Sequence, residues 1–184
     1  MTTPEPRLAP LEENEWTPEV REMLLKTKSG GFNAVFNIFK TMAHHPKAMK
    51  RWMVFANHVM YKSTLTARER EILILRISWL CQTEYEWAHH VRIALREGLD
   101  EADIALIRAG TGAWAGNEAL LAAAADDLFR DQMISDETWG GLQHHYDTKQ
   151  MIDIVLTVAN YNLISMVLKT LRVSLDDDLV GFEG

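Results

Sequence analysis

The chain of 184 residues is long enough to bury one sizeable hydrophobic core, and its length does not require a second domain. Its net charge of -7 argues against a duplex nucleic acid partner, which calls for a basic face. No run reaches the roughly 18 apolar residues of a membrane helix, and Cys81 is the only cysteine, so no intramolecular disulfide can form. With no apolar signal core at its start, we expect a cytoplasmic protein without a membrane partner.

The N-terminal third predicts an arm followed by short helices. The first sixteen residues are acidic and contain Pro4, Pro6 and Pro10, so we expect an extended arm over residues 1–16 and one helical domain over residues 17–184. Residues 19–28 predict a short helix that ends at Ser29-Gly30-Gly31. Residues 32–43 predict a second helix, because apolar residues recur at helical spacing at Phe32, Val35, Phe36 and Phe39.

The centre of the chain, Thr66 to Val91, predicts two tightly joined helices. A third helix opens at Pro46 before it. Thr66 and Glu69 have the spacing of a capping box, and eight of the ten residues from Ile72 to Cys81 are apolar, so the helix they begin should be mostly buried. After a break at Cys81-Gln82, Thr83 and Glu86 repeat the capping-box spacing and predict the start of the next helix.

The C-terminal half continues as helices. Asp100 starts a short one that stops at Gly110, and an alanine-rich helix runs from Glu118 to about Gln132 with Leu120, Leu121, Ala124, Leu128 and Phe129 facing inward. Ser135 caps another. Asp147 and Gln150 begin the last long helix, which is apolar almost all round and therefore predicts deep burial or a subunit interface. We find no strand alternation, so the chain is predicted to be all-α.

Glu86 and His90 are the first candidates for chemistry, because they lie one turn apart on the same helix face. The carboxylate could hold the imidazole in one tautomer and raise its basicity, as in an acid-base pair. The structural alternative is that Glu86 only completes the capping box of Thr83, and a surface pair at this spacing contributes only about 0.2–0.5 kcal/mol.

Glu71 and Arg76 stand out as charges on the apolar helix. Glu71 would be costly to bury without a partner, which makes it a candidate proton relay, although it could also lie in the exposed first turn. Arg76 could pair with Glu71 or Glu84, reach the surface, or face the pocket and hold a substrate carboxylate.

Other candidate substrate-binding residues come from the neighbouring helix faces. Tyr85 and Arg92 share a face with His89, which points about 100° away from His90. Asn57, His58 and Tyr61 end the third helix and could line the pocket from another side. We predict no metal, because Glu86 and His90 lack a third ligand at a telling spacing.

The central stretch resembles the carboxymuconolactone decarboxylase family, which shares its fold with the alkylhydroperoxidase AhpD group. The similar segments are REREILILR, TEYEWAHH, FNIFKTMAHHP, MISDETW and LTVANYN, and the resemblance extends from about Phe32 to Asp177. The redox members carry a Glu, then twelve positions on a Cys-x-x-Cys, and a His four residues after the second Cys. These positions fall here on Glu71, Thr83, Glu86 and His90.

The resemblance implies a single-domain, AhpD-like helical bundle that assembles as a trimer or hexamer. Because this chain lacks the cysteine pair, its pattern is closer to that of the decarboxylase branch. We therefore expect cofactor-free lyase or isomerase chemistry on a small carboxylated or lactone-type metabolite, as in aromatic catabolism. His90 would donate the proton, Glu86 would orient it, Glu71 would act as a relay, and Arg76 or Arg92 would anchor the substrate. The alternatives are a peroxidase-like oxidoreductase that uses Cys81 alone, and a non-catalytic oligomeric binding protein.

Overall fold

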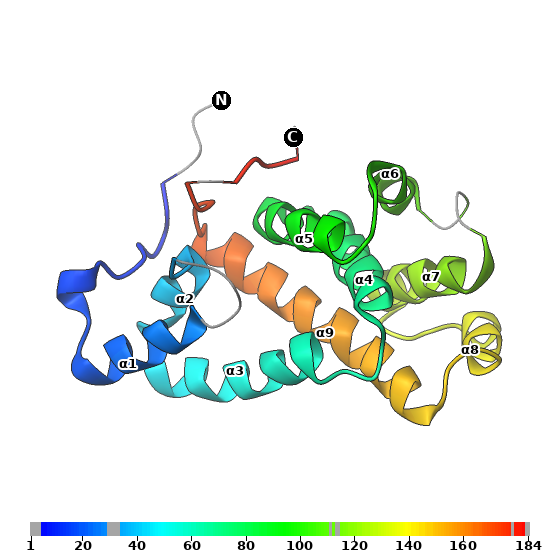
Figure 1. Cartoon of the computed structure of the whole chain (residues 1–184), viewed down its shortest axis with the longest axis horizontal. Helices are drawn as coiled ribbons and strands as arrows, with labels where there is room; N and C mark the ends of the chain where they lie inside the picture. The colour runs from blue at the N-terminus through cyan, green and yellow to red at the C-terminus, as the bar shows by residue number, and fades with distance from the viewer. Residues whose placement is uncertain (1–4, 29–33, 111, 113–114, 178, 183–184) are drawn as a thin grey trace.

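The computed structural model describes residues 5–28, 34–110, 112, 115–177 and 179–182, and within them the chain forms helices and no strand (Figure 1). The elements are η1 (Glu13–Glu15), α1 (Pro18–Thr27), α2 (Asn37–Met42), α3 (Pro46–Tyr61), α4 (Ala67–Leu80), α5 (Glu84–Arg96), α6 (Glu101–Ala109), α7 (Gly116–Asp131), α8 (Asp136–Gln143) and α9 (Thr148–Leu171). The prediction of an all-α protein is confirmed.

Helix α4 is the centre of the main hydrophobic core. It packs against α5, α6, α7 and α9, and every residue from Glu71 to Ser78 is buried. The helix begins where the sequence predicts, because Thr66 and Glu69 form both bonds of the capping box. Two residues of opposite charge, Glu71 and Arg76, are therefore fixed within the core by the position of this one helix.

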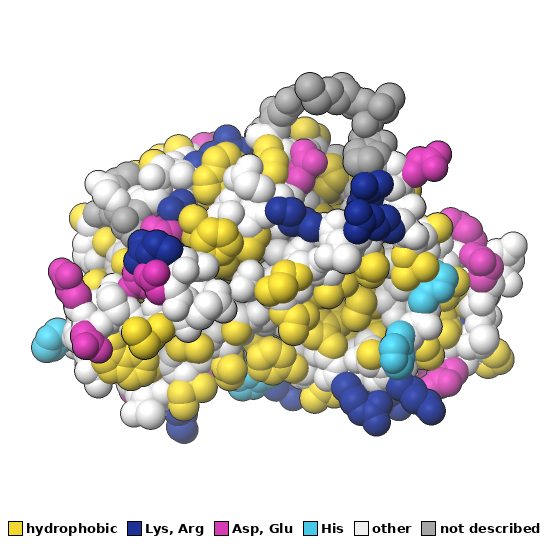
Figure 2. Space-filling view, turned by 180° about the vertical axis from the view of Figure 1, so that it is seen from behind, with side chains coloured by type: hydrophobic (Ala, Val, Ile, Leu, Met, Phe, Trp, Pro, Cys, Tyr) yellow, Lys and Arg dark blue, Asp and Glu magenta, His cyan; other side chains and the backbone are white. Residues whose placement is uncertain are grey.

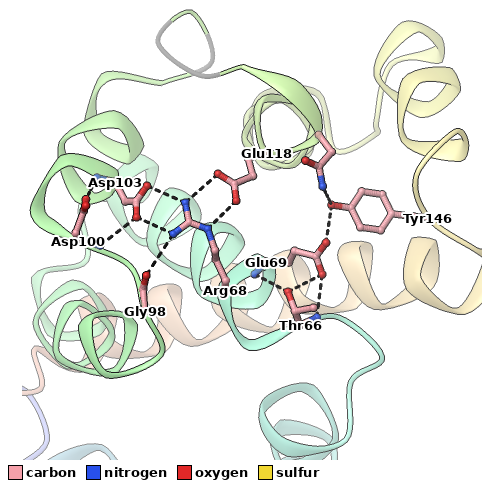
Figure 3. A network of polar contacts seen from close by, with 9 residues as sticks. Thr66, Arg68, Glu69, Gly98, Asp100, Asp103, Glu118 and Tyr146 are labelled. Carbon is pink, nitrogen blue, oxygen red and sulfur yellow. Dashed lines mark hydrogen bonds and ion pairs between the residues drawn. The ribbon is translucent and has the colours of Figure 1, made fainter.

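Polar contacts fix the start of α4 against α6, α7 and the segment that follows α8 (Figure 3). Arg68 donates to Asp103 at the start of α6 at 2.7 and 2.8 Å, and to Glu118 in α7 at 2.7 and 3.0 Å. Glu69 accepts a bond of 2.9 Å from the hydroxyl of Tyr146, which follows α8. Fork-like arginine pairs of this kind restrict geometry as well as contributing energy, so they help to hold Glu71 in place one turn further along.

Helices α1 to α3 form a second, smaller hydrophobic cluster, which contains Val20, Leu24, Val35, Ala43 and Met49. The helix predicted over residues 32–43 is wrong in its first half, because α2 begins only at Asn37 and Phe36 is extended. Phe32 lies outside the described residues. The late start has a tertiary cause: the backbone N–H of Asn37 donates to Asp176, and that of Ile38 donates to the hydroxyl of Tyr85.

Three local predictions are corrected. Thr83 makes no capping bond, and its buried hydroxyl has no partner, so the second capping box is wrong. Phe129 was expected to face inward but is 39% exposed near the end of α7. The described part of the arm is not wholly extended, because it contains η1, and its Arg7 N–H donates to the carbonyl of Leu171 at 2.9 Å. The division into an arm and one domain stays a prediction.

Helix α9 crosses the molecule beside α4 (Figure 1). By length and composition it could also cross a membrane, but this is weak evidence, since 56% of its most apolar stretch is buried inside the molecule, as in the core helix of a soluble protein. Its outer side still exposes Ile152, Leu163 and Met166. Figure 2 shows further apolar side chains in patches across the face seen from behind.

Candidate active site

A cleft of about 530 Å³ lies between the two hydrophobic clusters, with walls from α1, α2, α3, α5 and α9. Its polar lining at α5 and α9 consists of side chains that are almost fully buried: Tyr85, Glu86, His89, His90, Asn160 and Tyr161. The rest of the lining is largely aromatic and aliphatic, including Phe36, Phe39, Trp52 and Ile164. A concave, mostly apolar cleft with a few convergent polar groups is the usual form of a small-molecule site.

His90 lies between two carboxylates. Its Nδ1 is 2.7 Å from Oε2 of Glu71, and its Nε2 is 3.5 Å from Oε2 of Glu86. Because an ionised carboxylate only accepts, the short bond places a proton on Nδ1 and directs Nε2 towards Glu86. The sequence predicted that Glu86 would orient His90, but the geometry gives that position to Glu71.

The surroundings of this trio shift its proton affinities. Burial raises the pKa of Glu86 to about 6, and the Glu71 charge acts in the same direction, against the influence of His90. Burial alone would lower the pKa of His90, but the carboxylates of Glu71 and Glu86 outweigh it, so the pKa of the imidazole is raised. Glu86 and His90 therefore both bind a proton more readily than they would in water.

Two residues that the sequence did not single out contact the trio of Glu71, Glu86 and His90. Arg70 Nε is 3.3 Å from the second oxygen of Glu71, so the fully buried carboxylate has a cation on one side and an imidazole on the other. The ring of Tyr161 lies edge-on to His90, with 4.8 Å between the ring centroids. The LTVANYN segment of the resemblance, which ends with Tyr161 and Asn162, was the only signal that pointed towards Tyr161.

His89 belongs to a second carboxylate-histidine pair on the same cleft. Its Nε2 is 2.9 Å from Asp176, which also accepts from the hydroxyl of Tyr85 at 2.5 Å and from the N–H of Asn37 at 2.9 Å. Burial lowers the pKa of His89, while these donors hold the pKa of Asp176 below its usual range against the effect of burial. Asp176 lies after α9, and no sequence signal placed it beside α5.

Arg76 does not face the cleft. Its Nε lies 2.6 Å from Asp126 in α7 and its Nη1 donates to the carbonyl of Ile107 at 2.8 Å, so the prediction that it pairs with Glu71 or Glu84 is wrong. A residue five positions after Glu71 is rotated by about 140° around the helix, which explains why the two side chains leave α4 in different directions.

Of the other candidate binding residues, Tyr85 lines the cleft, as do Asn57 and Tyr61, but His58 and Arg92 do not. His58 bonds Asp153 in α9 at 3.1 Å, where that carboxylate also accepts from the N–H and hydroxyl of Thr64. His58 therefore helps to join α3 to α9.

Cys81 ends α4 away from the cleft lining, and its thiol donates to Asn162 at 3.3 Å. Burial raises the pKa of this thiol, so it is held in its unreactive protonated form. Among the described residues we find no group of three or more His, Cys, Asp or Glu side chains in a metal-binding arrangement. That no metal is bound stays a prediction for elemental analysis.

Comparison with known proteins gives a family match and a shared fold. Residues 46–126, which contain Glu71, Glu86 and His90, match the model of the carboxymuconolactone decarboxylase family. No curated protein matches the chain.

Solved structures of similar fold include an alkylhydroperoxidase AhpD core, a peroxidase-related protein from Ralstonia eutropha JMP134, at a TM-score of 0.81 and 19% identity over 96% of this chain and 95% of that one. A peroxidase-related protein from Silicibacter sp. TM1040 has a TM-score of 0.80 and 16% identity over 97% and 96% of the two chains. A variant of the debrominase Bmp8 in complex with 2,3,4-tribromopyrrole has a TM-score of 0.79 and 12% identity over 96% and 95%. These likenesses confirm the AhpD-like fold.

Proposed function

Since the chain belongs to the carboxymuconolactone decarboxylase family and has an AhpD-like fold, we propose that it is a cofactor-free acid-base enzyme of the lyase or isomerase type. Its substrate would be a small carboxylated or lactone-type metabolite, as in aromatic catabolism. The observation that carries the proposal is the buried trio, in which His90 bonds Glu71 at 2.7 Å and has Glu86 3.5 Å from its other nitrogen.

In an isomerisation, Glu86 removes a proton from a carbon next to a carbonyl group, and the electron pair moves into the carbonyl to form an enolate. His90 then donates the proton on Nε2 to another carbon of the conjugated system. The proton that Glu86 has gained passes to His90 and restores the resting state. A pKa of about 6 for Glu86 suits a base that works near neutral pH, and Glu71 stabilises the imidazolium.

In the lyase version, the bond to the carboxylate carbon breaks instead, CO2 leaves, and its electron pair forms the dienolate. His90 donates a proton to carbon, and solvent resupplies it. This version needs a cation for the carboxylate that leaves, and Arg76 is bonded to Asp126 away from the cleft. The isomerase version is therefore the better supported of the two.

The peroxidase alternative has less support. The resemblance places Thr83 and Glu86 where the redox members carry cysteines, and neither residue can form a thiolate. Cys81 has a raised pKa and lies outside the cleft lining. The binding-protein alternative would be favoured by a closed apolar interior, whereas a cleft opens beside His90.

The test is hydrogen exchange between solvent and candidate substrates. A panel of small lactones and conjugated ketones is incubated with the protein in D2O, and proton NMR follows loss of signal at carbons next to the carbonyl group. At least one compound should exchange faster with the protein than without it, and His90→Gln should abolish the gain. His145→Gln is the matched control, because His145 is exposed. Exchange that survives His90→Gln would overturn the proposal.

We also propose a cytoplasmic homo-oligomer, a trimer or hexamer as the family resemblance implies. The exposed apolar residues of α9 support an assembly.

A further inference from the structure

We infer that the substrate is an uncharged, ring-sized carbonyl compound that also carries a hydroxyl group, with the carbonyl oxygen at Asn160 and the hydroxyl at His89. This inference rests on the proposed function and narrows its substrate class from carboxylated or lactone-type metabolites to the uncharged ones. It depends on the charges around the cleft, on its walls, and on the hydrogen bonds already made by His89 and Asn160.

The cleft has no lysine or arginine at its inner end among the described residues that line it. Its two lysines, Lys26 and Lys50, are exposed and share the outer rim with Glu19 and Glu22. Lys26 pairs with Glu22 at 2.6 Å, so the four rim charges balance. A substrate carboxylate that reached the inner end would meet only Glu86, His89 and His90 as titratable neighbours besides tyrosines.

The charges behind the inner wall also balance without a ligand. Arg70 offsets Glu71, and the Asp176 carboxylate and the Arg92 cation act in opposite directions on His89. His90 and Glu86 together carry one extra proton in the resting state of the proposed cycle, so these groups have no net charge. A carboxylate there would add an uncompensated charge among almost fully buried side chains, and this is costly unless a further proton enters with it. A neutral ligand avoids this cost.

The walls favour a ring. Phe36, Phe39 and Trp52 line one side and Ile93 and Ile164 line another, around a volume of about 530 Å³. That volume is within the range of small-molecule sites, and aromatic walls favour the flat faces of ring compounds.

The polar side chains at the inner end of the cleft differ in the hydrogen bonds that they can still make to a ligand. Trp52 Nε1 only donates, so the atom of Asn160 that it contacts at 3.1 Å is the oxygen, and the Asn160 amide N–H groups are left for a ligand. His89 donates from Nε2 to Asp176, so Nδ1 of the neutral ring keeps its lone pair. Asn160 can therefore donate to a carbonyl oxygen, and His89 can accept from a hydroxyl group.

Equilibrium binding to three probes tests this class by isothermal titration at pH 7. The probes are methyl 4-hydroxybenzoate, the 4-hydroxybenzoate anion, and methyl 4-methoxybenzoate, which lacks the hydroxyl hydrogen. We expect the hydroxy ester to bind about tenfold more tightly than either of the others. The methoxy ester loses one hydrogen bond, and the anion brings one poorly solvated charge into the cleft. Affinity for the anion should rise as the pH falls, because a proton must enter with it.

Two variants assign the preferences to residues. Glu86→Gln should reduce the difference in affinity between the hydroxy ester and the anion. His89→Phe should remove the difference in affinity between the hydroxy and methoxy esters. His145→Phe, on the exposed surface, should change neither. The wild-type comparison decides the class even if a variant does not fold.

Tighter or equal binding of the anion by the wild-type protein would overturn the inference, and so would the absence of binding by all three probes. Its failure is separable from that of the proposed function, because these are binding measurements. Exchange that depends on His90 with an anionic substrate would keep the acid-base proposal and reject the neutral substrate.

Discussion

Glu71 Oε2 lies 2.7 Å from Nδ1 of His90, although 19 residues separate the two in the chain. The bond joins α4 to α5, and Glu71 has no exposed surface. A fully buried carboxylate in contact with an imidazole fixes both the tautomer and the orientation of the ring. The position of the reactive nitrogen is therefore set by how two buried helices pack.

Replacing Glu71 with Gln should lower both the pKa of His90 and the rate of the proposed reaction. The amide keeps the shape of the side chain but removes the charge that raises the pKa of His90, so this pKa should fall and the imidazole should be neutral over a wider pH range. We expect the exchange rate to fall by about 100-fold. NMR titration of the His90 ring checks the pKa, and Glu97→Gln at the exposed end of α5 is the control. An unchanged His90 pKa would contradict the role given to Glu71.

Glu86→Gln should lower activity and raise the stability of the folded protein at pH 8. The pKa of Glu86 is raised from 4.5 to about 6 in the folded chain, so its contribution to stability is full below pH 4.5 and is lost as the pH rises through 6. Gln cannot ionise, so at pH 8 the variant should be more stable than the wild type by about 2 kcal/mol, the free-energy equivalent of that shift. Near pH 4 the difference should vanish.

Urea unfolding at both pH values measures this difference. Glu97→Gln should stay within about 0.5 kcal/mol of the wild type at either pH, as expected for a surface change. A Glu86→Gln variant that is less stable than the wild type at pH 8 would mean that the carboxylate is needed for the fold.

Much of the fold could be predicted from the sequence, because local signals control it. The capping residues Thr66, Asp100, Ser135 and Asp147 each form the predicted bond and start the predicted helix. The failures lie where tertiary contacts compete with local ones. Phe36 has the periodicity of a helix interior, yet Asp176 and Tyr85 bond the first amides of α2 and begin the helix after it.

The site was only half predictable for a similar reason. His90 and Glu86 share one helix face, so spacing alone identified them. The spacing could not reveal that Glu71 would approach the other nitrogen of His90, since this depends on the angle between α4 and α5. Asn160 lines the cleft and Asp176 bonds His89, and both come from parts of the chain far from α5, which no local pattern reports.

Arg76→Met should destabilise the protein without weakening ligand binding. The change leaves Asp126 without its cation and the carbonyl of Ile107 without its donor, and breaking a largely buried pair from one side costs about 3 kcal/mol. Chemical unfolding measures the loss, and adding Asp126→Asn should recover part of it. A large loss of affinity for a cleft ligand, in a variant that still folds, would restore Arg76 as a substrate anchor.

Cys81→Ser should leave any turnover of hydroperoxide unchanged. The thiol has a raised pKa. Cys81 is the only cysteine in the sequence, so no second thiol in the chain can resolve a sulfenic acid. Peroxide consumption with a dithiol reductant should be equally slow in both proteins. Robust turnover that disappears in Cys81→Ser would revive the peroxidase alternative.

The last prediction concerns assembly through α9. Ile152, Leu163 and Met166 lie on its outer side and are 53%, 48% and 58% exposed, an unusual surface for the longest helix of a monomer. Association would bury this side and contribute about 25 cal/mol per Å² of apolar surface. Val167 lies on the same helix but is a poor probe of this side, because it packs against the main core.

We therefore expect light scattering to return a mass well above the 21.0 kDa of one chain at micromolar concentration. Met166→Glu should dissociate the assembly, because a charge would have to be buried in an apolar interface. Lys149→Glu, at the exposed start of the same helix, should leave the mass unchanged. A wild-type protein that remains a monomer would show that α9 exposes its outer side for another purpose, and the oligomer prediction would be wrong.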